Sequence, residues 1–138
     1  MSAVDTARKA VEAFNRHDAQ AFAELYAPEA VALDPQYSEP LNGREAIRKD
    51  IEDFLAAFPD VQATISNVLA DGDTVGFEVE ITGTHRGPLV VPDGTVLATN
   101  RRLEMRGGRF VTVDAQGQIT QCRRYYDMAA IMAQLGLI

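Results

Sequence analysis

The chain has 138 residues, of which 46% are hydrophobic, and its formal net charge is -7. These values suit one domain, residues 1–138, whose core needs no metal or disulfide support. The negative charge argues against nucleic acid and anionic membranes as partners, because both attract surfaces rich in Lys and Arg. Cys122 is the single cysteine, and the first residues lack the apolar core of a signal peptide. We therefore expect a cytoplasmic protein without a membrane span.

Two helices and a short strand are predicted first along the chain. Apolar residues recur at helical spacing from Ala7 to Phe14, and Asp18 can cap a second, shorter helix. Residues 30–34 have the composition of a brief strand, and the segment that follows, up to Pro40, has that of a loop. Asp34, at the end of this strand, and Tyr37, in the loop, are candidates for a functional site.

The clearest helical pattern follows Gly43. Its apolar positions share one face and are Ile47, Ile51, Phe54, Leu55 and Phe58. Charged residues occupy the other positions, and Pro59 ends the helix at or before Phe58. Phe54 and Phe58 can be core residues, or they can form the wall of a cavity.

An antiparallel hairpin is predicted next. Apolar residues alternate from Val61 to Leu69 and again from Val75 to Ile81, on either side of a tight turn at Gly72. If the alternation continues without a bulge, His85 points to the core side. It would then be either a structural partner or a polar group of a pocket.

The following segment, residues 95–113, should supply two strands or one long strand bent at Gly107 and Gly108. Six of the 13 basic residues fall on the last strands: Arg101, Arg102, Arg106, Arg109, Arg123 and Arg124. They can pair with Glu78 and Glu80 on an exposed or interfacial sheet face. Alternatively, Arg123 projects into a cavity, where it binds an anionic group or keeps a carboxylate ionised.

The last part of the chain, residues 118–136, reads as a strand followed by a short helix. Strict alternation places Arg123, Tyr125 and Asp127 on one face and Cys122 on the other. Without a neighbouring His, Cys122 is a poor candidate nucleophile. Asp127 directly precedes the helix, so it can be an N-cap or an acid-base group at the end of the strand.

Helices followed by antiparallel strands indicate an α+β fold. Over nearly its whole length the chain resembles the SnoaL-like polyketide cyclases of the nuclear transport factor two-like superfamily. The segments that carry the resemblance are Asn15-Arg16-His17-Asp18, Asp34-Pro35, Leu41-Asn42-Gly43-Arg44, Phe58-Pro59-Asp60, Gly72-Asp73, Gly83-Thr84-His85, Pro92-Asp93-Gly94, Tyr126-Asp127 and Gln134-Leu135-Gly136. The resemblance implies a cone-shaped, curved antiparallel sheet wrapped around a cavity that the N-terminal helices cover. Its expected core residues are Phe14, Phe22, Ile51, Phe54, Phe58, Phe77, Val79 and Ile81.

The resemblance also implies a chemistry. In these cyclases the Asp that matches Asp127 is the general acid-base of an intramolecular aldol ring closure on a polyketide ester, without metal or cofactor. An enolate formed in such a cavity needs a hydrogen-bond donor, for which His85, Tyr125 and Arg123 are candidates. Phe54, Phe58 and Tyr37 are the expected ligand-contacting residues.

Two alternatives to the cyclase or isomerase are open. The superfamily also includes epoxide hydrolases, which use two carboxylates and an Arg around a water molecule, and Asp34 would then be the second acid. A non-catalytic module for binding a small molecule or for dimerisation is the other. In either case, alternating Arg and Glu residues on the outer sheet face favour a homodimer.

Overall fold

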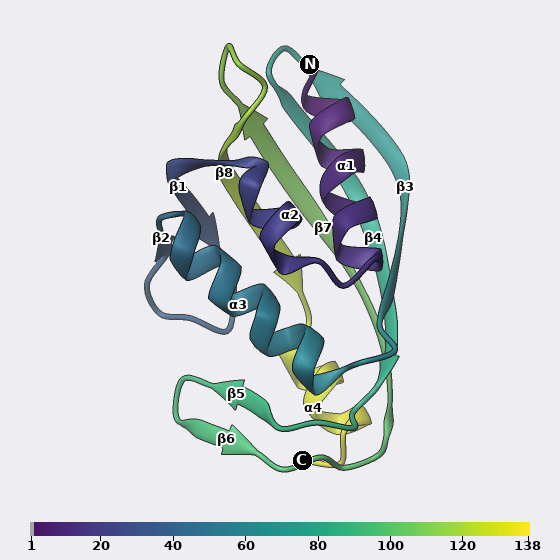
Figure 1. Ribbon diagram of the computed structural model, residues 1–138. Coiled ribbons are helices and arrows are strands. Elements are labelled where there is room, and N and C mark those ends of the chain that lie inside the picture. Colours follow the sequence, from purple (N-terminus) through teal and green to yellow (C-terminus); the bar gives the residue numbers. More distant parts are fainter. Residues whose placement is uncertain (1) are drawn as a thin grey trace.

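The computed structural model describes residues 2–138, which form a curved six-stranded sheet with the first three helices on its concave side (Figure 1). The helices are α1 (Ala3–Asn15), α2 (Ala19–Glu24), α3 (Arg44–Ala57) and α4 (Met128–Gln134). The strands are β1 (Tyr26–Leu33), β2 (Leu41–Asn42), β3 (Gln62–Asp71), β4 (Thr74–Thr84), β5 (Leu89–Val91), β6 (Gly94–Val96), β7 (Arg102–Val113) and β8 (Ile119–Tyr126). The expected α+β architecture, with a curved sheet covered by N-terminal helices, is confirmed.

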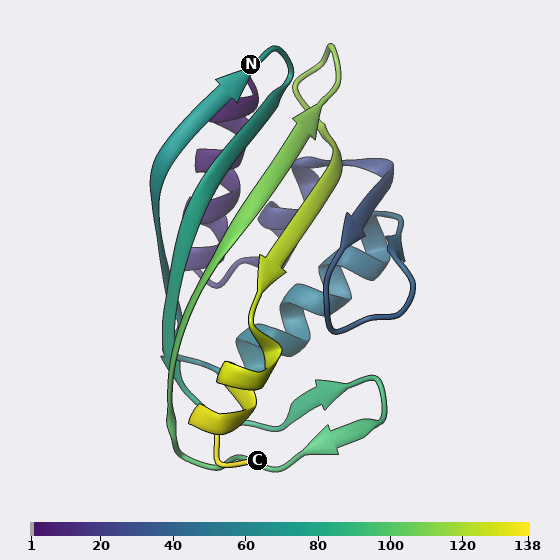
Figure 2. The same cartoon turned by 180° about the vertical axis from the view of Figure 1, so that it is seen from behind.

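The order of strands in the sheet is β2-β1-β8-β7-β4-β3. Neighbouring strands are antiparallel except for β1 and β8, which run parallel. The sheet is therefore mostly antiparallel, whereas an entirely antiparallel sheet was expected. β5 and β6 form a separate hairpin that lies near the C-terminal end of α3 (Figure 2). Residues 95–113 thus contribute to two strands, and β7 continues through Gly107 and Gly108. Within residues 2–138, no helix is both long and apolar enough to cross a bilayer.

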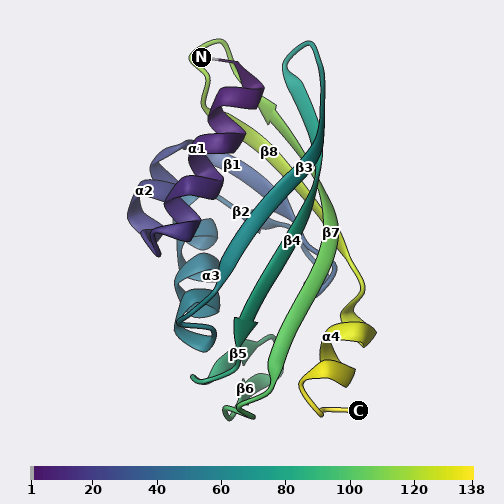
Figure 3. The same cartoon turned by 90° about the vertical axis from the view of Figure 1, so that its right-hand side faces the viewer.

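Local sequence explains where α1 and α3 begin and end. Ser2 and Asp5 form a capping box at the start of α1, in which each side chain accepts a hydrogen bond from the other residue's backbone N–H. The buried face of α1 is mostly alanine, which lets the helix lie close to the sheet (Figure 3). α3 begins after Gly43 and ends before Phe58, as the sequence pattern predicted.

The core lies between these helices and the concave face of the sheet. Of the expected core residues, seven are buried: Phe14, Phe22, Ile51, Phe58, Phe77, Val79 and Ile81. Phe54 is partly buried and packs against them. The core prediction from helical and strand periodicity is therefore confirmed.

The register of β8 differs from the prediction. Ile119 and Cys122 are both buried, although strict alternation would put them on opposite faces. The reason is a bulge: Thr112 is opposite Gln121 but Val113 is opposite Ile119, so Thr120 is an extra residue in β8. One extra residue moves every later side chain to the other face.

Candidate active site

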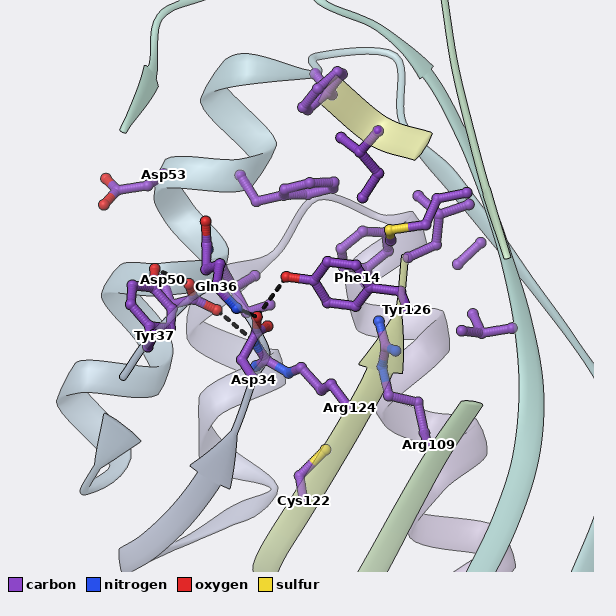
Figure 4. A pocket seen from close by; sticks show the side chains of 18 of the residues that line it. Phe14, Asp34, Gln36, Tyr37, Asp50, Asp53, Arg109, Cys122, Arg124 and Tyr126 are labelled. Atoms are coloured by element: carbon purple, nitrogen blue, oxygen red, sulfur yellow. Dashed lines mark hydrogen bonds and ion pairs between the residues drawn. The ribbon is translucent and has the colours of Figure 1, made fainter. Parts of the chain in front are cut away.

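A cavity of about 410 Å³ lies between α1, α3 and the concave face of the sheet. The β5–β6 hairpin and α4 contribute further lining residues. Most of the wall is apolar and includes Phe14, Phe54, Phe58, Phe77 and Met105. Polar and charged side chains gather on one part of the wall, where the loop after β1, α3 and β8 meet (Figure 4).

Arg124 joins two carboxylates on this wall. Its Nη1 lies 3.0 Å from Asp34 Oδ2 and 2.7 Å from Asp50 Oδ2. The exposed fractions of the side chains are only 8% for Arg124, 5% for Asp34 and 10% for Asp50. β8 thus supplies the cation, the end of β1 supplies one anion and α3 supplies the other.

Each carboxylate also accepts a hydrogen bond from a tyrosine. The Tyr126 hydroxyl donates to Asp34 Oδ1, and the Tyr37 hydroxyl donates to Asp50 Oδ1 at 2.7 Å. The backbone N–H of Gln36 donates to Asp34 Oδ1 at 3.0 Å. The result is a continuous array from Tyr126 through Asp34, Arg124 and Asp50 to Tyr37, drawn with dashed lines in Figure 4.

The surroundings fix the protonation of the tyrosines and the arginine. Burial, and then the hydrogen-bonded carboxylate of Asp34, raises the pKa of Tyr126 well above its ordinary value. Burial and Asp50 have the same effect on the pKa of Tyr37. Burial lowers the pKa of Arg124, but negative groups around it, Asp50 first, outweigh this and raise it overall. At neutral pH the phenols are therefore uncharged donors, and Arg124 is a cation.

A second arginine, Arg109, faces the same cavity from β7. It is the register partner of Arg124 on the neighbouring strand. Burial, and then the like charge of Arg124, lowers the pKa of Arg109. Within residues 2–138 no carboxylate oxygen lies within 4.0 Å of its nitrogens.

Asp127 does not join this array. Its Oδ1 accepts a hydrogen bond from the backbone N–H of Ala130 at 3.1 Å, and its side chain is exposed. It is the N-cap of α4 and is absent from the cavity wall. The capping interpretation is confirmed, and the prediction that Asp127 faces the cavity is wrong, because β8 ends at Tyr126 in the shifted register.

Arg123 and Tyr125 are also on the outer face. Arg123 is exposed, and Tyr125 is 54% exposed with its ring edge-on to Phe110 at 6.1 Å between centroids. The prediction that they lie on the concave side is wrong for the same reason, the bulge at Thr120. Arg124 and Tyr126, one residue along from each, take the cavity positions.

His85 lies on the concave side, as predicted, and is fully buried. Its Nδ1 accepts a hydrogen bond from the Thr99 backbone N–H at 3.2 Å and contacts the Thr99 hydroxyl at 3.0 Å. Its ring packs against Phe58, 5.4 Å between centroids, and it does not line the cavity. Burial lowers the pKa of His85. This placement favours the structural role over the role of a pocket donor.

The other predicted site residues, Phe54, Phe58, Tyr37 and Asp34, all line the cavity, and their role in ligand binding stays a prediction. Sequence reasoning missed Asp50, although a signal was present. Asp50 follows Ile47 by three positions and precedes Phe54 by four, so it lies within the apolar stripe of α3. A carboxylate inside a buried stripe calls for a buried partner, which Arg124 provides.

The fold and the cavity together define an α+β domain whose curved sheet encloses an apolar chamber with buried ionisable groups. The sequence profile of the SnoaL-like domain matches residues 7–122, and the chain belongs to this family. No curated protein matches the chain by sequence.

Three solved structures illustrate what the chain is similar to. A protein from Jannaschia sp. CCS1, described as a SnoaL-like polyketide cyclase, shares 18% identity with a TM-score of 0.85, covering 99% of this chain and 92% of its own. IdmH from Streptomyces antibioticus, described as a polyketide cyclase, shares 29% identity with a TM-score of 0.78 and 99% coverage of both chains. SalBIII, an epoxide hydrolase/cyclase-like enzyme in pyran ring formation in salinomycin, shares 19% identity with a TM-score of 0.75 and 92% coverage of both.

Proposed function

We propose that this protein is a cofactor-independent acid-base enzyme that catalyses ring closure or isomerisation of a small, largely hydrophobic carbonyl compound, such as a polyketide ester. The observation that carries the proposal is the pair of buried carboxylates, Asp34 and Asp50, that share Arg124 on the wall of an apolar cavity. Membership of the SnoaL-like family supports the reaction class. In this proposal Asp34 has the acid-base role that the resemblance implied for Asp127.

The array suits proton transfer next to a carbonyl group. When a substrate carbonyl accepts the Tyr126 hydroxyl, that hydrogen bond is diverted from Asp34, and Oδ1 becomes free to act as a base. Asp34 then removes the proton from the neighbouring carbon, and Tyr126 stabilises the enolate oxygen. In an aldol ring closure the enolate carbon attacks a second carbonyl, and protonated Asp34 returns its proton to the new alkoxide. Arg124 keeps both carboxylates in place throughout.

Epoxide opening is a second candidate, favoured by the same shared arginine. Two carboxylates on either side of one guanidinium can divide the work: one removes a proton from the attacking hydroxyl or water, and the other, protonated, donates to the epoxide oxygen. Both candidates use Asp34 as an acid-base group, so substrate identity discriminates between them. Native mass spectrometry of freshly purified protein, with identification of any co-purified molecule, is the first measurement.

The decisive variants are Asp34→Asn and Asp50→Asn, with Asp127→Asn as the matched control on an exposed carboxylate. Asn preserves the shape but is no base near neutral pH, so Asp34→Asn should lose about 100- to 10,000-fold in turnover. Asp127→Asn should retain normal turnover. Normal turnover by folded Asp34→Asn and Asp50→Asn proteins would remove the acid-base assignment. Tight binding without turnover by the unmodified protein would favour the non-catalytic binding module.

We also propose a cytoplasmic homodimer that associates through the convex sheet face. Leu69, Phe110 and Tyr125 are exposed there, by 77%, 49% and 54%, and the Phe110 ring lies over Gly76. A monomer in analytical ultracentrifugation at micromolar concentration would exclude the dimer. The free, buried Cys122 is compatible with a reducing compartment.

A further inference from the structure

Arg109 is a charged side chain of the cavity wall that the proposed proton transfer does not use. It extends from β7, and in Figure 4 its guanidinium is directed toward Tyr126. Within residues 2–138 its guanidinium makes one hydrogen bond, from Nη1 to the backbone oxygen of Gly108 at 3.2 Å. Within residues 2–138 its other two nitrogens have no hydrogen-bond partner, and they keep some solvent-accessible surface.

The neighbouring arginines show that Arg109 is unusual. Arg106, three residues earlier on β7, pairs with Glu80 on the outer face at 3.2 Å, and Arg124 pairs with two carboxylates. The largest charge effect on Arg109 comes from Arg124 and is repulsive; attraction to Asp34 is weaker. A cation in an apolar wall, without a counter-ion and beside a like charge, lowers the stability of the empty cavity. An anion bound at Arg109 would offset both the desolvation and the repulsion.

We propose that Arg109 is the subsite for a carboxylate group of the ligand, so that the ligand is an apolar carboxylic acid with its body in the cavity. This inference rests on the proposed function for the reaction, but its binding claim can be tested without turnover. Arg109 and Arg124 are opposite each other on adjacent strands, and Tyr126 follows two residues after Arg124. A ligand held at Arg109 by its carboxylate would therefore present a nearby carbonyl to Tyr126 and Asp34. The substrate class narrows to keto acids with a largely hydrophobic remainder.

The experiment compares two probes of nearly equal shape, 2-naphthylacetate and 2-naphthylacetamide, by isothermal titration calorimetry at pH 7.5. The proteins are the unmodified chain, Arg109→Gln, Arg109→Lys and the control Arg106→Gln, which removes a cation from the outer face of the same strand. We expect the unmodified protein and Arg106→Gln to bind the carboxylate about 10- to 100-fold more tightly than the amide, as a charge-assisted hydrogen bond to a desolvated guanidinium allows. Arg109→Gln should lose this preference and keep its affinity for the amide, and Arg109→Lys should keep part of it.

Three outcomes would overturn the proposal. These are equal affinity of the unmodified protein for both probes, an undiminished carboxylate preference in Arg109→Gln, and no binding of the carboxylate to the unmodified protein at about 1 mM. If the unmodified protein bound both probes equally, Arg109 would not bind a ligand carboxylate and would instead stabilise negative charge that develops during the reaction. Asp34→Asn separates this claim from the proposed function, because it should abolish turnover and leave the preference for the carboxylate intact.

Discussion

Replacing Arg124 by Met should lower the free energy of unfolding more than the replacement of any single charged residue on the surface. The substitution keeps an apolar stem of similar length but leaves Asp34 and Asp50, which are 5% and 10% exposed, as buried carboxylates that share no cation. Removing one partner of a buried ion pair costs about 3–5 kcal/mol, since the remaining charge is neither solvated nor paired. For a domain of this length the unfolding midpoint should fall by about 10–20 °C.

The assays are thermal and urea unfolding at pH 7.5, both monitored by tyrosine fluorescence and far-UV circular dichroism. Arg106→Met is the control, because its partner Glu80 is exposed and an exposed ion pair contributes only about 0–1 kcal/mol. Adding Asp34→Asn and Asp50→Asn to Arg124→Met should recover most of the lost stability, because it removes the unpaired charges. A cost below about 1 kcal/mol for Arg124→Met, or no recovery in the triple variant, would refute the view that Arg124 neutralises two desolvated carboxylates.

Three further predictions concern other parts of the fold. Asp127→Asn should leave the melting temperature unchanged and Asp127→Ala should cost about 1 kcal/mol, because Asn caps a helix as well as Asp does; equal losses in thermal unfolding would contradict the capping role. The lowered pKa of His85 means that the unfolded chain takes up this proton first, so His85 contributes no pH dependence above about pH 6.5 and stability falls below it. Urea unfolding at pH 7.5 and 5.5 should show a smaller difference for His85→Asn than for the unmodified chain. Gly107→Ala should cost about 1–3 kcal/mol, because its Cβ would lie 2.2 Å from Tyr125 O, whereas Gly108→Ala, with 3.9 Å to its nearest neighbour, should cost less in the same assay.

Much of the fold could be predicted from local patterns. The stripe of α3 and the alternation of β4 each span many residues without an irregular position, so the local pattern alone identifies the buried face. The parallel pairing of β1 with β8 could not be predicted in this way. It joins the first and last strands of the chain, and no local pattern records which distant strand lies beside another.

The candidate site was harder to predict because it depends on register. One bulge at Thr120 decides which face of the sheet each later residue of β8 occupies. The local composition of β8 does not indicate this bulge. The sequence therefore pointed to Arg123, Tyr125 and Asp127 where the cavity contains Arg124 and Tyr126. Asp34 and Tyr37, both predicted site residues, line the cavity, whereas Asp50, which contacts Tyr37 and Arg124, was assigned to the solvent side of α3.

The parallel contact between β1 and β8 has a consequence for the order of folding. Asp34 and Arg124 are 90 positions apart in sequence, so their ion pair forms only after the chain has closed a loop of that length. Such non-local closure is slow compared with the formation of the β3–β4 hairpin. A partly folded chain can thus contain the helices and central strands while it still lacks a binding cavity. Ligand affinity during refolding would therefore report the pairing of β1 with β8, and a ligand bound in the cavity would slow the separation of these strands.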